Sequence, residues 1–270
     1  GWLPLGERFQ IASTFFEGVG PSQMWVGDLE GDGRPEVLLA RGGLVRVLAF
    51  AEPPAVEVLA QINATRPGAQ IVAVTAASTA PGRTPMILAL DRSAGLVYVA
   101  TPGDAGVWEI ATEVDIGLES PQRLAVGDWD GDGILDLAVK GSLALELHFG
   151  GTTNPPLEQL ATLASPVRDG RFGRVESLAW DGGTPLAHFV DHRFHVLVTQ
   201  GWAPSPETWI EAWRFKVFET QNELRRDWDR DLTRVNVEPR EMAAGDADGD
   251  GLDDLVMLCH DHLLIYRRRE

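Results

Sequence analysis

The chain has 270 residues, 44% of them hydrophobic, which is enough to bury the core of one large domain or two small ones. A formal net charge of −17, from 23 basic and 40 acidic side chains, argues against nucleic acid and anionic membranes as partners. There is no apolar run long enough to be inserted in a membrane, and a single cysteine, Cys259, rules out an intrachain disulfide.

Three aspartate-rich loops of one shape begin at Asp28, Asp128 and Asp246. Each has acidic residues at loop positions 1, 3, 5 and 9 and glycines at positions 4 and 6. Ca²⁺ prefers such a shell of oxygens, the glycines permit the sharp turn, and the carbonyl of position 7 can complete the shell. We predict three Ca²⁺ ions, one in each loop. The expected ligands are Asp28, Glu30, Asp32, Arg34, Glu36, Asp128, Asp130, Asp132, Ile134, Asp136, Asp246, Asp248, Asp250, Leu252 and Asp254.

An acidic surface turn is the alternative interpretation of one such loop, because Asp and Gly are ordinary turn residues. Three copies with the same acidic positions favour a metal site. The loop is not an EF-hand, since position 12 holds Leu39, Val139 and Met257 instead of glutamate. Short apolar segments flank every copy, so each loop is expected to join two strands.

The spacing of the loops predicts a repeat. Asp128 lies 100 residues after Asp28, and Asp246 lies 118 residues after Asp128, so each gap has room for one further unit. Two segments without the full acidic loop, 71–99 and 175–198, follow the same plan, and their second strands both begin with Thr-Pro and end with Asp. We therefore predict five units, near residues 20–65, 66–118, 119–168, 169–237 and 238–270.

The outer strand of the units also recurs, as an apolar–Glu–apolar–Ala pattern at 56–60, 108–111 and 157–161. The last unit ends after its third strand, and Phe9–Ala12 has a related pattern at the start of the chain. We predict an all-β chain forming a single β-propeller of five four-stranded blades, whose last blade is completed by residues 1–19. An insertion at 201–222, with Trp202, Trp209 and Trp213, is expected to be an extra hairpin or an interaction loop.

The pattern Gly-Asp-x-Asp-Gly-Asp-Gly-x-x-Asp-Leu, at 127–137 and 245–255, resembles the FG-GAP/VCBS repeat of integrin-alpha-type propellers. A weaker version lies at 27–37, where Glu30 and Glu36 replace aspartates. The resemblance implies a β-propeller that binds Ca²⁺ between the first and second strands of a blade. It also implies an extracellular, periplasmic or cell-surface location, in some cases within a larger surface protein or complex. Propellers of that family have about seven blades, so five is a departure.

Basic or imidazole side chains occupy the turn between the second and third strands of all five units. Arg41, Arg92, Lys140 and Arg193 are the candidates for binding an anionic ligand on the face opposite the calcium loops. The Cys259–His262 segment is better explained as a core cysteine followed by a polar turn than as a transition-metal site.

No nucleophile elbow, zinc-protease helix or nucleotide-binding loop occurs in the sequence. The expectation is therefore a non-catalytic, calcium-binding recognition or structural module, not an enzyme, whose partner is a protein or an acidic glycan. The alternative is a lectin or a polysaccharide-active enzyme on the same scaffold. Neither nucleic acid binding nor insertion into a membrane is expected.

Overall fold

The computed structural model describes most of the strands and part of the loops. The described residues are 16–50, 56–77, 85–103, 106–129, 132, 134–141, 143–150, 157–164, 172–178, 186–191, 196–204, 207–216, 239, 241–250, 254–259 and 262–267. The predicted closing strand at Phe9–Ala12 and the candidate residues Asp130, Arg193 and Leu252 lie outside this set. Within it, no helix has the length and hydropathy that a membrane span requires.

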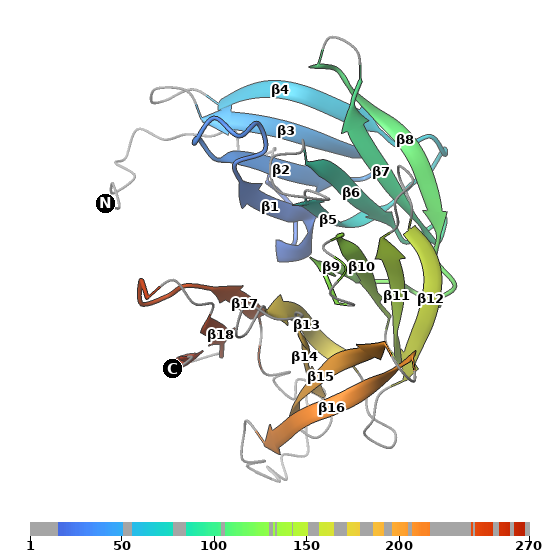
Figure 1. The fold of residues 1–270 in the computed structure, drawn as a ribbon. Coiled ribbons are helices and arrows are strands. Elements are labelled where there is room, and N and C mark those ends of the chain that lie inside the picture. The colour runs from blue at the N-terminus through green and yellow to red at the C-terminus, as the bar shows by residue number, and fades with distance from the viewer. Residues whose placement is uncertain are drawn as a thin grey trace, which may run out of the picture. The chain divides into compact units, whose positions relative to one another are not determined.

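The described strands form five antiparallel sheets, each a meander in which neighbours in sequence pair with one another (Figure 1). The first sheet follows a short 3₁₀ turn, η2 (Pro21–Gln23). The strands of the first sheet are β1 (Met24–Gly27), β2 (Glu36–Arg41), β3 (Leu44–Phe50) and β4 (Val56–Asn63). Those of the second are β5 (Ile71–Ala77), β6 (Met86–Asp91), β7 (Leu96–Pro102) and β8 (Trp108–Asp115).

The remaining three sheets follow in chain order. The third sheet contains β9 (Arg123–Gly127), β10 (Asp136–Lys140), β11 (Ala144–Gly150) and β12 (Leu157–Ala164). The fourth contains β13 (Phe172–Leu178), β14 (Leu186–Asp191), β15 (Val196–Pro204) and β16 (Glu207–Lys216). The fifth has three described strands, β17 (Glu241–Gly245), β18 (Asp254–Leu258) and β19 (Leu263–Tyr266).

Burial differs between the inner and outer strands in the way their sequences suggest. The second strand of the second sheet, β6, reads Met-Ile-Leu-Ala-Leu-Asp, and all six residues are buried. A continuous apolar run of this kind is typical of a strand covered on both faces. The outer strand β8 alternates between half-buried and exposed residues over most of its length, so one of its faces meets solvent.

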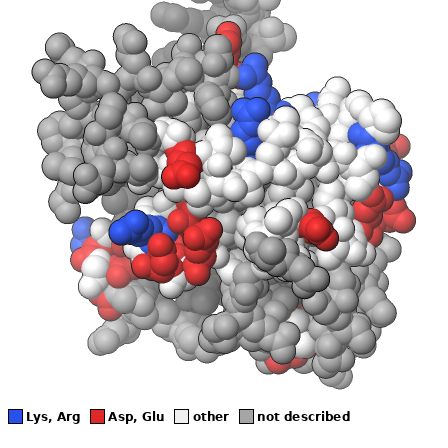
Figure 2. Space-filling model, turned by 90° about the horizontal axis from the view of Figure 1, so that it is seen from above, with Lys and Arg blue, Asp and Glu red and all other residues white. Residues whose placement is uncertain are grey.

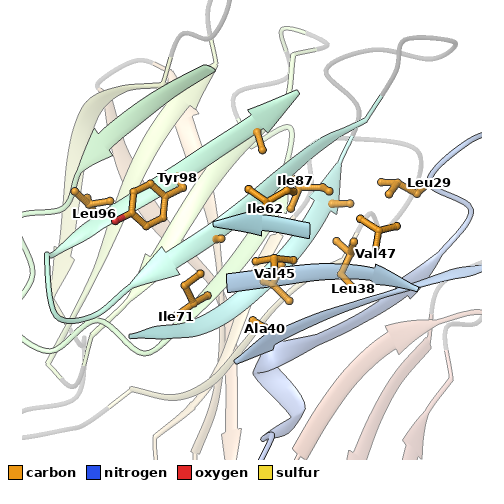
Figure 3. Packing of buried hydrophobic residues seen from close by; sticks show 14 residues of the cluster. Leu29, Leu38, Ala40, Val45, Val47, Ile62, Ile71, Ile87, Leu96 and Tyr98 are labelled. Atoms are coloured by element: carbon orange, nitrogen blue, oxygen red, sulfur yellow. The ribbon is translucent and has the colours of Figure 1, made fainter. Parts of the chain in front are cut away.

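The chain divides into two compact units, which are described separately. In the unit that contains residues 1–124, the first two sheets pack face to face (Figure 3). Leu38 and Val45 of the first sheet and Ile71, Ile87 and Leu96 of the second belong to one buried apolar cluster. This contact is the largest described core of the unit, and it supplies the hydrophobic stabilisation that a single twisted sheet lacks.

A side chain reinforces the same contact. The Gln23 amide nitrogen donates to the carbonyl of Ala40 in the first sheet, at 3.3 Å, and to the carbonyl of Ile71 in the second, at 2.9 Å. Its amide oxygen accepts the backbone N–H of Gly20 at 3.0 Å. Gln23 therefore fixes the entry to β1 and links two sheets.

In the second unit, sheets that follow one another in sequence also share apolar clusters. Val198 of β15 packs with Leu145 and Leu147 of the third sheet. Leu197, its neighbour in sequence, packs instead with Met242 and Leu255 of the fifth sheet. Because successive residues of a strand point to opposite faces, β15 is covered on both sides.

The insertion proves to be part of a blade where it is described. Its residues 201–204 and 207–216 lengthen β15 and β16, whose pairing runs to Pro204 opposite Glu207. Trp202 lies opposite Trp209 in this register. Where the segment is described, it elongates the third and fourth strands of its sheet and adds no separate hairpin.

Candidate functional site

The three acidic loops lie where the sequence places them, between the first and second strands of the first, third and fifth sheets. In the first loop the Asp28 carboxylate accepts the backbone N–H groups of Gly31, Asp32 and Gly33 at 2.7–3.0 Å. Gly33 has φ = +84°, a left-handed conformation that strongly favours glycine. The glycines of the motif thus serve the backbone path that wraps around the first aspartate.

The acid at the ninth position makes the same contact in every copy. Glu36, Asp136 and Asp254 each accept the backbone N–H of the second loop residue, at 2.7, 2.7 and 3.2 Å respectively. All three carboxylates are buried, at 3%, 0% and 0% exposure. Burying a carboxylate is costly unless hydrogen bonds or a cation compensate it, so this shared position is suited to a cation.

Among the described residues, the acidic groups of the third loop lie closest to a metal-binding geometry. One carboxylate oxygen from each of Asp246, Asp248 and Asp254 lies within 4.8 Å of the others. Among the described residues this gathering of three acidic groups occurs only in the third loop. Three carboxylate oxygens that converge at a glycine-rich turn match the oxygen ligands that Ca²⁺ prefers, so the donor set fits the ion expected from sequence.

Trp129, the second residue of the middle loop, lies in the core although it belongs to an acidic loop. Its side chain is fully buried against Leu145, Leu147 and Phe149. The hydrogen bond from its backbone N–H to Asp136 holds the residue on the inner side of the loop. Its ring therefore belongs to the core.

The predicted basic turns lie at the other ends of the same strands. The Ile71 N–H donates to the Gly42 carbonyl at 2.7 Å, and the Arg92 N–H donates to the Gln70 carbonyl at 3.0 Å. These two hydrogen bonds attach the β2–β3 turn and the β6–β7 turn to the same two residues, Gln70 and Ile71. Arg41 and Arg92, both exposed, are thus placed at one end of the first unit.

Lys140 differs from these two arginines. It is the last residue of β10, lies opposite Leu145 and is buried, with 5% exposure. Arg193 is outside the described residues, as stated above. On the face shown in Figure 2, basic side chains lie beside acidic ones, with uncharged surface between the clusters. Of the four predicted residues, Arg41 and Arg92 are the two that are described and exposed, so they are the candidates for binding an anion.

The Asp91 carboxylate organises the turn that carries Arg92. It accepts hydrogen bonds from the Ser93 hydroxyl at 2.7 Å, from the Tyr98 hydroxyl at 3.2 Å, and from the backbone N–H groups of Gln70 and Ser93. Burial by itself raises the pKa of Asp91, but the hydrogen bonds from Ser93, Gln70 and Ala94 outweigh burial and lower it. Asp91 is therefore an ionised anchor inside the turn, a role that the pattern of basic residues in the sequence does not indicate.

Comparison with protein-family models finds no match, and comparison with curated proteins finds none either. Solved structures do match. A Bacteroides uniformis protein provisionally named a 6-phosphogluconolactonase is 16% identical, with a TM-score of 0.58 over 91% of this chain. The periplasmic gluconolactonase of Pseudomonas aeruginosa is 18% identical, with a TM-score of 0.60 over 89%. BBS1N, solved in complex with ARL6DN, is 13% identical, with a TM-score of 0.56 over 91%.

This chain spans about two thirds of each of these neighbours, 66%, 65% and 65% of their lengths. At such low identity the likeness is one of fold. The expectation of a non-catalytic calcium-binding module that is not an enzyme is contradicted, because the neighbours include proteins named as lactonases. The absence of familiar sequence motifs was a poor guide, since a fold of this kind can host chemistry without them. The chain has the all-β, β-propeller fold that its repeats predict.

Proposed function

We propose that this protein is a hydrolase of a phosphorylated sugar lactone. The observation that carries the proposal is the likeness of its fold to proteins named 6-phosphogluconolactonase and gluconolactonase. In lactone hydrolysis the oxygen of water adds to the carbonyl carbon and the ring C–O bond breaks. The ring oxygen takes a proton, and the product is a hydroxy acid.

Arg41 and Arg92 supply the second part of the proposal. Both are exposed, and the hydrogen bonds at Gly42 and Gln70 hold their turns beside the same segment. A guanidinium group binds phosphate oxygens through paired N–H donors, in the geometry that phosphate recognition favours. We therefore place the phosphate of the substrate at this end of the first unit, in an otherwise acidic protein.

We further propose that Ca²⁺ occupies the three acidic loops, as in FG-GAP/VCBS-type repeats, and that its role is structural. In the first sheet the calcium loop precedes β2 and the basic turn follows it. The proposed ligand Glu36 and the arginine Arg41 are the first and last residues of β2, and a strand rises about 3.3 Å per residue, so these two residues lie roughly 17 Å apart. The metal would hold the loop closed, and the opposite end would bind the substrate.

A location outside the cytoplasm fits both parts of the proposal. The Pseudomonas aeruginosa neighbour is named as a periplasmic protein. Calcium sites of extracellular modules commonly bind at about 10⁻⁴ to 10⁻³ M, so they require the calcium concentration found outside cells. We propose the periplasm or the cell exterior as the compartment.

A titration of acid release tests the catalytic proposal with two substrates, 6-phosphogluconolactone and glucono-1,5-lactone. We expect hydrolysis of the phosphorylated lactone well above its spontaneous rate. Changing Arg41 and Arg92 together to Ser should raise the KM for the phosphorylated lactone about tenfold or more, because charge-assisted hydrogen bonds are lost. The KM for the uncharged lactone should stay within about twofold.

Arg46→Ser is the matched control, since Arg46 lies within β3 and its guanidinium donates to Gln61 at 3.1 Å. It removes one positive charge from the same sheet but not from the turns. If neither lactone is hydrolysed by the calcium-loaded protein, the proposed activity is wrong. Hydrolysis that responds to Arg46→Ser as strongly as to the double change would place the phosphate elsewhere.

A further inference from the structure

Arg267 contacts one of the acids proposed to bind Ca²⁺. One terminal nitrogen of its guanidinium lies 3.5 Å from the Asp248 carboxylate, which belongs to the cluster of Asp246, Asp248 and Asp254. The Arg267 side chain is 61% exposed and that of Asp248 is 23% exposed. The Arg267 guanidinium thus lies beside the point where the three carboxylate oxygens converge. It is positively charged, as is the Ca²⁺ ion that these oxygens would bind.

The pairing of β18 and β19 explains why this arginine reaches the loop. Leu255 lies opposite Tyr266, which is the last residue of β19. Continued by one residue beyond the end of β19, this antiparallel register places Arg267 across from Asp254, the buried acid at the ninth position of the loop. The strand register delivers the guanidinium to the metal ligands with no need for a flexible tail.

The same position in the other two calcium-loop sheets holds an uncharged residue. Ala49 lies opposite Glu36 in the first sheet. Phe149 follows His148, which lies opposite Leu137, so Phe149 is the residue opposite Asp136 in the third sheet. Among the three acidic loops, the basic residue at this register position belongs to the third alone.

We infer that Arg267 is a built-in competitor of Ca²⁺, which pairs with Asp248 when the third loop is empty and is displaced from it when the metal binds. The inference rests on the calcium sites proposed above. A neighbouring positive charge has two effects on the loop: it reduces repulsion among the carboxylates of the empty state, and it repels the incoming ion. Both effects weaken calcium binding at this loop. The third loop therefore binds Ca²⁺ at a higher calcium concentration than it would if Arg267 were absent.

Removal of Arg267 is the direct test. In a protein whose first two loops are disabled by Asp32→Ala and Asp132→Ala, calorimetric titration with calcium reports on the third loop. Arg267→Gln should tighten calcium binding about threefold to tenfold, the size expected for one partly screened charge several ångströms from a divalent ion. Added salt should reduce the difference in calcium affinity between Arg267→Gln and its parent, because salt screens the charge of Arg267.

The control is Arg268→Gln in the same background, because it removes the same charge from the adjacent residue. Its affinity should stay within about twofold of the parent, since the inferred effect belongs to the contact between Arg267 and Asp248 and not to net charge. Thermal melting gives a second measurement. Arg267→Gln should melt below its parent in excess chelator and gain more from calcium, because only the empty loop loses its counter-ion.

The reciprocal change is Ala49→Arg, made in a protein with the first loop intact and the other two disabled by Asp132→Ala and Asp250→Ala. It should weaken calcium binding at the first loop by a similar factor. Equal affinities for Arg267→Gln and Arg268→Gln would overturn the role of Arg267 and leave the calcium sites standing. An absence of calcium binding in the unaltered protein would instead overturn the calcium sites themselves.

Discussion

At the scale of single residues, Asp91 shows how a buried charge can be kept ionised. Its carboxylate is fully buried, and it accepts hydrogen bonds from two hydroxyl groups as well as from backbone N–H groups. These donors favour the ionised form, so the pKa of Asp91 lies below its ordinary value of 3.8. The contribution of Asp91 to stability is then complete above that ordinary value and is lost as the pH falls through the lowered pKa.

Asp91→Asn tests this directly. The change keeps the shape of the side chain but gives up the charge, so we expect it to cost about 1–3 kcal/mol of unfolding free energy near pH 7. Urea unfolding at about pH 7 and at a series of pH values below 3.8 measures how this cost changes as Asp91 takes up its proton. The difference between the two proteins should shrink at low pH. A difference in unfolding free energy that does not change with pH would mean that the shape of the Asp91 side chain stabilises the fold and its charge does not.

A residue-level property that the sequence does not reveal is the direction of a side chain near the end of a strand. Lys140 follows an apolar strand and precedes a turn, and such a lysine is ordinarily exposed, yet it is buried opposite Leu145. Trp129 lies in an acidic loop but points into the core. Glu146 and His148 form a buried pair, with a carboxylate oxygen 2.8 Å from a ring nitrogen. In each case tertiary contacts decide, and these are invisible to local pattern.

At the scale of the structural element, each acidic loop is a short connection that must hold several negative charges together. Without metal these carboxylates repel one another, and the hydrogen bonds from the loop backbone to Asp28 and Asp246 offset only part of that repulsion. The Ca²⁺ that we propose for these loops would bind the folded loop alone, and it would therefore stabilise the fold by mass action.

Removal of calcium should therefore lower the melting temperature. With a dissociation constant of about 10⁻⁴ M, about 1 mM calcium contributes roughly 1.4 kcal/mol per loop. Differential scanning calorimetry in excess chelator, followed by restoration of calcium, measures the effect. Asp132→Ala and Asp250→Ala should each remove one bound ion by equilibrium dialysis and leave the other two. A melting temperature that is unchanged in excess chelator would count heavily against metal binding in these loops.

The elements themselves were predictable where local signals agree. Acidic loops with glycines at fixed positions, flanked by apolar segments, mark the turn from β1 to β2 and its counterparts, and the observed strands begin and end there. The alternating patterns at 56–60 and 108–111 likewise mark β4 and β8, which the structure extends to Asn63 and Asp115. The extension of β15 and β16 beyond the length of the other strands was not predicted, because a register depends on cross-strand packing.

At the scale of the whole molecule, the fifth sheet poses the question of how its edge is protected. Its described strands end with β19, and Leu263 and Ile265 of that strand are 54% and 43% exposed. An open apolar edge invites pairing with another chain. The sequence offers Phe9–Ala12, which carries the outer-strand pattern, as the strand that covers it.

Deletion of residues 1–15 is the corresponding experiment. If Phe9–Ala12 completes the fifth sheet, the shortened protein should aggregate, as light scattering or size-exclusion chromatography would reveal. A deletion of residues 1–7, which spares the pattern, serves as the control. A soluble shortened monomer that is as stable as its parent would show that the fifth sheet needs no strand from the N-terminus.

The bond network of Gln23 has a consequence for the order in which the chain acquires its structure during synthesis. Its amide joins Ala40 to Ile71, which lies 48 residues after Gln23. The first sheet ends at Asn63, so it can be complete in sequence while the carbonyl that this amide requires has not yet left the ribosome. Domains fold as their chain emerges from the ribosome. The hydrogen bond from Gln23 at the start of the first sheet to Ile71 can form only after the first residue of β5 has emerged. We therefore expect the first two sheets to fold as one kinetic unit, although each is a separate meander.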